Sequence, residues 1–244
     1  MNTGTIKNAG LRIFYKFQRK FSHAGWVLSN PSQKILQDNG FLGNLEDSDI
    51  AEHLHLLYLL AITKNPRSIL ELGTRGGEST RALKAAAISL GIKGFSIDLD
   101  SAPPGLDDEN WQHFVGNDLE LGLEIAERRL ILGGSSSENI DFLFIDTSHE
   151  YQHTFDELRV YWPLVSRSGV VVFHDTNLSS KRKRMLSGRI YSGWNNNRGV
   201  IAAIEDFFAI KVPEDKMYLS KKPTELVAIY HVPWSNGLTV LVKS

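Results

Sequence analysis

The 244-residue sequence lacks cysteine, an excess of either charge and any long apolar run. The absence of cysteine excludes disulfides, thiolate metal sites and a cysteine nucleophile, and it fits a reducing compartment. Lysine and arginine number 27 against 28 aspartates and glutamates, so no overall field recruits nucleic acid. No apolar run reaches the roughly 18 residues of a membrane-spanning helix, and the start of the chain lacks the pattern of a signal peptide. We therefore expect a cytoplasmic protein without a transmembrane segment and without a nucleic-acid partner.

What the sequence does contain is an alternation of strand and helix patterns. With 42% hydrophobic and 23% charged residues, the composition is that of an ordinary globular protein. Short apolar runs at 69–72, 94–98, 111–115, 140–146 and 170–173 alternate with helical patterns, which is typical of a parallel sheet with helices on both faces. Segments 225–231 and 238–243 follow as two closing strands joined through a turn.

Two segments fall outside this alternation. Residues 1–46 begin with a basic amphipathic pattern, which predicts an N-terminal helical cap packed on the main domain or lying on a membrane or partner subunit. A homo-oligomer contact through this helix is one expectation, and the main domain is then 47–244. Residues 177–198 contain four consecutive basic residues, aromatic groups and three consecutive asparagines. We interpret this insertion as a substrate lid, with a solvated basic loop as the alternative.

Residues 69–80 organise the rest of the chain. They read as a buried strand, a glycine turn and a helix start with two hydroxyl residues. The glycines do not follow the G-x-G-x-x-G spacing of dinucleotide sites. The segment instead resembles the first motif of class I S-adenosylmethionine (SAM)-dependent methyltransferases. This resemblance implies a cofactor cradle formed by Glu71, Gly73, Thr74, Gly77, Ser79 and Thr80.

Acidic and amide side chains end the next two strand patterns. Asp98 closes the second apolar run about twenty residues after the glycines, where a carboxylate can accept both hydroxyls of a ribose. A strand-end acid that only caps a loop is the alternative. Asn117 and Asp118 follow the third strand, and in the methyltransferases the corresponding turn lies beside the adenine. Asp118 serves equally well as the N-cap of the following helix.

Two further motifs make the resemblance to a particular group of methyltransferases more specific. Residues 145–151 read Ile-Asp-Thr-Ser-His-Glu-Tyr, and His174 and Asp175 follow the fifth strand. Together with the glycine turn, these motifs resemble the group that includes macrocin O-methyltransferase and cephalosporin-hydroxylase-like proteins. The resemblance implies a Rossmann-like class I methyltransferase fold of the α/β class, with a seven-stranded, mostly parallel sheet in the order 3-2-1-4-5-7-6. It covers roughly residues 47–244.

The acidic residues suggest a metal. In that sheet order, Asp146 and Asp175 end adjacent strands about 5 Å apart, and such a carboxylate pair is repulsive unless a cation or a shared proton lies between them. We predict a divalent metal bound by Asp146, His174 and Asp175, with Mg²⁺ first and Mn²⁺, Fe²⁺ or Zn²⁺ admitted by the imidazole. His149, assisted by Asp146, is the predicted general base. A solvated or proton-shared carboxylate pair without metal is the alternative.

The sequence thus predicts a SAM-dependent O-methyltransferase of natural-product biosynthesis that acts on a hydroxyl of a sugar, glycoside, polyketide or phenol. Three alternatives remain open. One is a metal-free methyltransferase with a histidine base, and another is a metal oxygenase of the cephalosporin-hydroxylase-like group. The third is a non-catalytic SAM-binding protein that acts through its N-terminus. His53 and His55 are interpreted as surface or packing residues, because residues two apart do not share a helix face.

Overall fold

The computed structural model describes residues 48–128, 130–132, 140–178, 182–183, 190–191, 198–220 and 227–244. Three segments of interest lie wholly or mostly outside these ranges. They are the predicted cap at 1–46, most of the predicted lid, and the basic run at 181–184, of which only residues 182 and 183 are described. The cap, its oligomer contact and the lid therefore stay predictions. Every helix within the described ranges is too short or too polar to cross a lipid bilayer.

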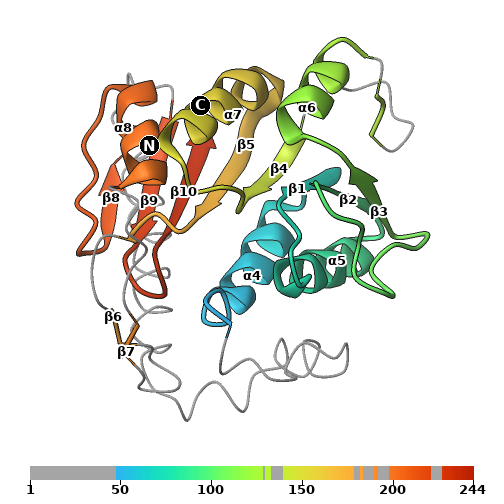
Figure 1. Ribbon diagram of the computed structural model, residues 1–244, viewed down its shortest axis with the longest axis horizontal. Coiled ribbons are helices and arrows are strands. Elements are labelled where there is room, and N and C mark those ends of the chain that lie inside the picture. Colours follow the sequence, from blue (N-terminus) through green and yellow to red (C-terminus); the bar gives the residue numbers. More distant parts are fainter. Residues whose placement is uncertain are drawn as a thin grey trace, which may run out of the picture.

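The core of the fold is one eight-stranded sheet (Figure 1). Five parallel strands lie in the order β3 (Trp111–Val115), β2 (Lys93–Asp98), β1 (Ser68–Leu72), β4 (Ile140–Ile145) and β5 (Val165–His174). The antiparallel strands β10 (Leu238–Lys243), β9 (Val227–Val232) and β8 (Tyr218–Ser220) follow. Without β8, this is the predicted order 3-2-1-4-5-7-6, so the class I topology is confirmed. The predicted count of seven strands is wrong by the edge strand β8, which has only three residues and no clear alternation.

Helices cover both faces of the sheet and give three layers (Figure 1). Helices α4 (Leu54–Lys64) and α5 (Glu78–Leu90) pack on one face. Helices α6 (Asp118–Ala126), α7 (Tyr151–Tyr161) and α8 (Gly199–Phe208) pack on the other, and the short 3₁₀ helix η2 (Trp162–Leu164) extends α7. Apart from this sheet, β6 (Arg182–Lys183) pairs with β7 (Ile190–Tyr191) as an antiparallel ribbon.

The apolar runs of the central strands explain the layers. In β4, Phe142 and Phe144 belong to the core beneath α4 and α5, whereas Leu143 and Ile145 belong to the core beneath α6, α7 and α8. All four side chains are at most 3% exposed. A strand that is apolar on both faces has to be covered on both, as expected for a parallel sheet.

Hydrogen bonds define the starts of two helices. Helix α4 begins at Leu54, because residues 48–53 form turns closed by the bonds from Ala51 N–H to the Ser48 carbonyl and from His53 N–H to the Ile50 carbonyl. In α6 the N-cap is Asn117, not Asp118: its side-chain oxygen accepts hydrogen bonds from Leu119 N–H and Glu120 N–H.

The topology also fixes where a ligand can bind. Strand β1 pairs in parallel with β2 on one side and β4 on the other, so the strand order reverses at β1. Ligand sites of open α/β sheets lie beyond the carboxyl ends of the strands at such a reversal. A ligand is therefore expected to bind beside the residues that follow β1, β2, β4 and β5.

Candidate active site

A cavity of about 530 Å³ lies at this edge of the sheet. It is lined by residues that follow all five parallel strands. The predicted site residues in its lining are Gly73, Thr74, Ser79, Asp98, Asn117, Asp118, Asp146, His149 and Asp175. Four others, Glu71, Gly77, Thr80 and His174, are not in the lining. A second hollow of about 930 Å³ beside α8 and β8 is lined by none of the predicted site residues.

The glycine turn forms the base of the cavity. Gly73 has a φ of +86°, and a Cβ at this position would lie 2.2 Å from the carbonyl oxygen of Asp146. The turn is tied to both neighbouring strands, since Gly73 N–H donates to the Ile97 carbonyl at 2.9 Å and Asp146 N–H donates to the Leu72 carbonyl at 2.9 Å. Only glycine fits this approach without strain, so the turn holds the β1, β2 and β4 ends together.

Glu71 lies behind the turn and is fully buried. Its two carboxyl oxygens accept hydrogen bonds from Ser79 Oγ and Thr80 Oγ1, each at 2.6 Å. Burial raises the pKa of this carboxyl to about 8, even though the two hydroxyls lower it. Glu71 therefore ties the end of β1 to the first turn of α5, and a direct contact of Glu71 with SAM stays a prediction.

Asp98 lines the cavity and is already engaged with the backbone. One oxygen accepts from Thr74 N–H at 2.6 Å and Arg75 N–H at 3.0 Å, and the other accepts from Asp100 N–H at 3.0 Å. Burial alone would raise the pKa of Asp98, but these N–H donors outweigh it and the pKa is lowered. A carboxylate has about four acceptor positions, so one remains for a ligand hydroxyl while the other three shape the turn.

The two strand-end aspartates meet two histidines in the predicted metal cluster. His149 Nε2 lies 3.2 Å from Asp146 Oδ1 and 2.8 Å from Asp175 Oδ2. His174 Nδ1 lies 3.4 Å from Asp146 Oδ1 and 3.2 Å from Asp175 Oδ1. His149 and Asp175 both have positive φ angles, 60° and 54°, a backbone conformation that is uncommon outside glycine and is often found at functional sites. The four residues predicted from sequence are therefore brought together.

The electrostatics of the cluster follow from its burial and its paired charges. Burial alone would lower the pKa of His149, but hydrogen bonds and charge from Asp146 and Asp175 raise it to about 10. For Asp175, burial acts to raise the pKa, and the neighbouring His174 and His149 outweigh it, so the pKa is lowered. A positive charge between the two aspartates is thus strongly favoured at neutral pH.

The residues present fit a divalent metal. One donor atom each from Asp146, His149 and Asp175 lies within 4.8 Å of the others. His174 Nδ1 and Asp175 Oδ1 are buried and lie at ion-pair distance from each other, and His174 Nε2 is buried and has no hydrogen-bond partner among the described residues. Buried polar atoms without a partner are costly, and a coordinated cation would satisfy them. The mixture of carboxylate and imidazole donors suits Mn²⁺, Fe²⁺ or Zn²⁺ as well as Mg²⁺.

Sequence reasoning missed two features of this region. His53, interpreted as a surface or packing residue, is fully buried, and its ring meets that of His174 edge to face with 5.2 Å between centroids. Asp118, instead of capping α6, pairs with His153 of α7, which also approaches Glu157. The only signal in the sequence was that His153 and Glu157 are four residues apart on a helix, which places them on one face.

Comparisons with known proteins agree with this architecture. Residues 70–176 match the model of a family described as a methyltransferase domain. This segment runs from within β1 to just beyond Asp175 and contains the glycine turn and the cluster of Asp146, His149, His174 and Asp175. A search of curated protein sequences found no match.

Solved structures with the same fold include three methyltransferases. One is an O-methyltransferase from Bacillus cereus in complex with S-adenosylhomocysteine (SAH), which is 17% identical to this chain. The match covers 89% of this chain and 94% of the Bacillus cereus chain, with a TM-score of 0.50. Another is TomG from Streptomyces achromogenes, an O-methyltransferase involved in tomaymycin synthesis, in complex with SAM. It is 18% identical, and the match covers 88% of this chain and 91% of the TomG chain, with a TM-score of 0.50.

The third is MycE from the mycinamycin biosynthetic pathway, in complex with Mg, SAH and mycinamycin VI. It is 16% identical over 89% of this chain, with a TM-score of 0.51, and the match spans only 55% of the MycE chain. At these identities, the likeness establishes the fold. Residues 70–176 thus match a methyltransferase domain, and the chain that contains them has the fold of these solved methyltransferases.

Proposed function

We propose that the protein transfers a methyl group from SAM to a hydroxyl of a small molecule, with help from a divalent metal and from His149. The observation that carries this proposal is that a single cavity contains both the glycine turn with Asp98 and the cluster of Asp146, His149 and Asp175. The acceptor class is a sugar or glycoside, a polyketide or a phenol.

The size and lining of the cavity support SAM as its ligand. Its volume of about 530 Å³ lies within the roughly 300–1,000 Å³ of ligand pockets. Asp98 offers its remaining acceptor position to the ribose, and Asn117 and Asp118 line the side beyond β3, where the adenine would lie. When bound, SAM supplies a methyl group on a sulfonium, which an oxygen nucleophile can attack in line.

Asp146, Asp175 and His174 are the residues that would hold the metal. A divalent cation there would lower the pKa of an acceptor hydroxyl and fix its direction. Asp146 and Asp175 supply charge from the ends of β4 and β5, and His174 supplies a buried ring nitrogen, Nδ1, that faces both carboxyl groups. MycE, the Mg-containing structure of similar fold, supports a metal as part of such a site.

His149 is the residue placed to remove the acceptor proton. Its Nε2 atom touches both aspartates and its side chain lines the cavity. When Asp146 and Asp175 carry their full charge, a pKa of about 10 keeps the ring protonated at neutral pH and unable to accept a proton. A cation shared by Asp146 and Asp175 offsets their charge and frees Nε2. The metal-free mechanism is therefore the weaker alternative.

The test is methyl transfer from methyl-labelled SAM to a panel of sugar, macrolide and phenolic acceptors. Metal assistance is worth several kcal/mol, so EDTA or Asp175→Asn should lower the rate at least about 100-fold and leave SAM affinity within about threefold. Asp107→Asn, an exposed residue outside the cavity, is the matched control.

Three outcomes separate the alternatives. Transfer that survives EDTA would replace the metal mechanism with a metal-free one. Iron content together with acceptor-dependent oxygen consumption and no methyl transfer would favour the oxygenase alternative, since aspartate and histidine also suit Fe²⁺. Absence of SAM binding would overturn the proposal as a whole.

A further inference from the structure

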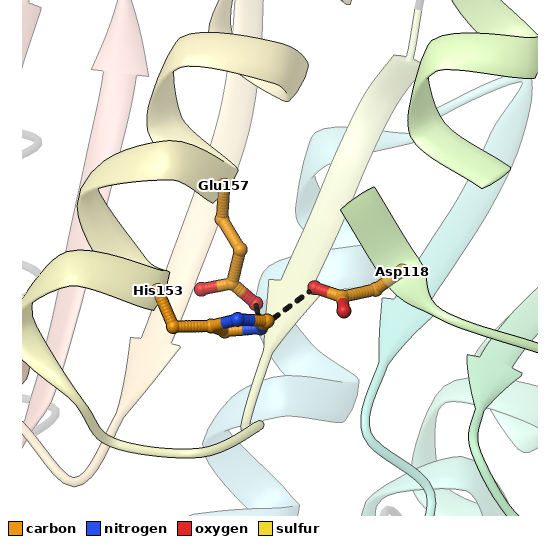
Figure 2. Close-up of side chains that lie close together, drawn as sticks. All are labelled: Asp118, His153 and Glu157. Atoms are coloured by element: carbon orange, nitrogen blue, oxygen red, sulfur yellow. Dashed lines mark hydrogen bonds and ion pairs between the residues drawn. The ribbon is translucent and has the colours of Figure 1, made fainter. Parts of the chain in front are cut away.

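A second cluster of metal-ligating side chains lies between α6 and α7 (Figure 2). Asp118 is the first residue of α6, and His153 and Glu157 project from successive turns of α7. His153 Nε2 lies 3.0 Å from Asp118 Oδ2 and 3.5 Å from Glu157 Oε1. Figure 2 shows both carboxyl groups linked to the same end of the imidazole ring. One donor atom from each residue lies within 4.8 Å of the other two.

Among the described residues, no lysine or arginine lies at ion-pair distance from the carboxyl groups of this cluster. Asp118 is 8% exposed and Glu157 is fully buried. Within the ranges that the structure describes, His153 is the one charged group at ion-pair distance from either carboxyl. Two buried carboxylates therefore share one imidazole, an arrangement that requires either extra protons or a cation.

An oxygen of Glu157 supplies an independent sign of a missing ligand. Its Oε1 atom accepts a hydrogen bond from Thr147 Oγ1 at 2.7 Å. Its Oε2 atom is buried and has no hydrogen-bond partner among the described residues. Thr147 thus fixes the orientation of the carboxyl group, as hydrogen bonds around metal ligands commonly do, while Oε2 remains available for bidentate coordination.

From this geometry we infer a second divalent-cation site, formed by Asp118, His153 and Glu157 and suited to Zn²⁺ or a similar transition metal. A doubly positive ion with a neutral imidazole balances the two carboxylates. Histidine nitrogen and carboxylate oxygen are both ligand types of Zn²⁺, and three protein ligands leave a coordination position open. Asp118 and His153 line the main cavity, so a water or a bound molecule can reach that position.

The competing arrangement holds protons in place of the ion. Burial raises the pKa of the Glu157 carboxyl to about 7, and the hydrogen bonds of Asp118 and Glu157 raise the pKa of His153 to about 10. A protonated Glu157 and an imidazolium would also neutralise the cluster. The two arrangements differ in whether the site takes up metal, which is directly measurable.

The test is a titration of the full chain with Zn²⁺ alone, in a background where the predicted site at Asp146 and Asp175 is disabled by Asp175→Asn. This background keeps the inference independent of the proposed methyl transfer. It should still bind one Zn²⁺ per chain, and adding His153→Gln or Glu157→Gln should weaken this binding at least about tenfold. Asp156→Asn, a neighbour on α7 that pairs with Gln152, is the matched control and should bind Zn²⁺ like the background.

Titration with Co²⁺ gives a second readout that does not depend on affinity alone. The Asp175→Asn background should develop visible absorption bands of coordinated Co²⁺, and His153→Gln should abolish them. Glu157→Gln keeps the shape of the side chain and provides a second variant in case His153→Gln misfolds. Circular dichroism checks that each variant is folded. If Zn²⁺ stoichiometry and Co²⁺ absorption are the same with and without His153→Gln and Glu157→Gln, the inference is wrong.

Discussion

Replacing Glu71 with glutamine tests the most unusual electrostatic feature of the glycine turn. The carboxyl is fully buried against Ser79 and Thr80, and its pKa rises from 4.5 to about 8 on folding. Because the folded state holds the proton more tightly, the contribution of Glu71 to stability is fully present below pH 4.5. It is lost as the pH rises toward 8. Glu71→Gln keeps the shape of the side chain and removes the titration.

The magnitude follows from the size of the pKa change. A shift of about 3.5 units corresponds to about 5 kcal/mol in total, at 1.36 kcal/mol per unit. Between pH 5 and pH 7, the Glu71 carboxyl is largely ionised in the unfolded chain and largely protonated in the folded one. The free energy of unfolding of the wild type should therefore fall by about 2.5 kcal/mol relative to that of the variant. Other groups titrate in the same range, but they are common to both proteins and cancel in the difference.

The assay is urea unfolding of both proteins at pH 5, 6 and 7 without added SAM or metal. The difference in free energy of unfolding between Glu71→Gln and wild type should become steadily more favourable to the variant as the pH rises. Parallel curves for the two proteins would refute the account, because they would mean that Glu71 ionises in the folded state as easily as in the unfolded chain.

Two further predictions concern the backbone around the cavity. Gly73→Ala places a Cβ 2.2 Å from the Asp146 carbonyl at a φ of +86°, so urea unfolding should show a loss of about 2–4 kcal/mol. Gly105→Ala, at a φ of +80° with no atom within 4 Å, should lose only about 1 kcal/mol, and equal losses would argue against the close approach. Asn117→Ala removes both cap hydrogen bonds of α6 and should cost about 1 kcal/mol in the same measurement; an unchanged midpoint would mean that the cap is not needed.

The strands and the acids at their ends were predictable from local sequence patterns, whereas the strand order followed from the resemblance to class I methyltransferases. Apolar runs that end in Asp98 and Asp146 locate β2 and β4, and their carboxyl ends have to meet at one edge of a parallel sheet. The short edge strand β8 was missed, because three residues with intermediate burial carry too little periodic signal.

Side-chain partners were harder to predict than elements. The sequence placed Glu71 at the cofactor, but whether a carboxyl faces a cavity or turns back to Ser79 and Thr80 depends on packing that spacing does not encode. The cluster of Asp118, His153 and Glu157 depends on how α6 docks against α7, since Asp118 and His153 are 35 residues apart. His53 reaches His174 only because α4 packs on the sheet face beneath the metal cluster.

Calorimetric titration with SAH tests the central claim, that this cavity is a cofactor site, most directly. The account predicts saturable binding of one SAH per chain, weakened at least about tenfold by Asp98→Ala, which removes about 1.4 kcal/mol or more of binding free energy. Asp107→Asn should bind like wild type. No binding at millimolar SAH, with the protein shown to be folded, would contradict the claim.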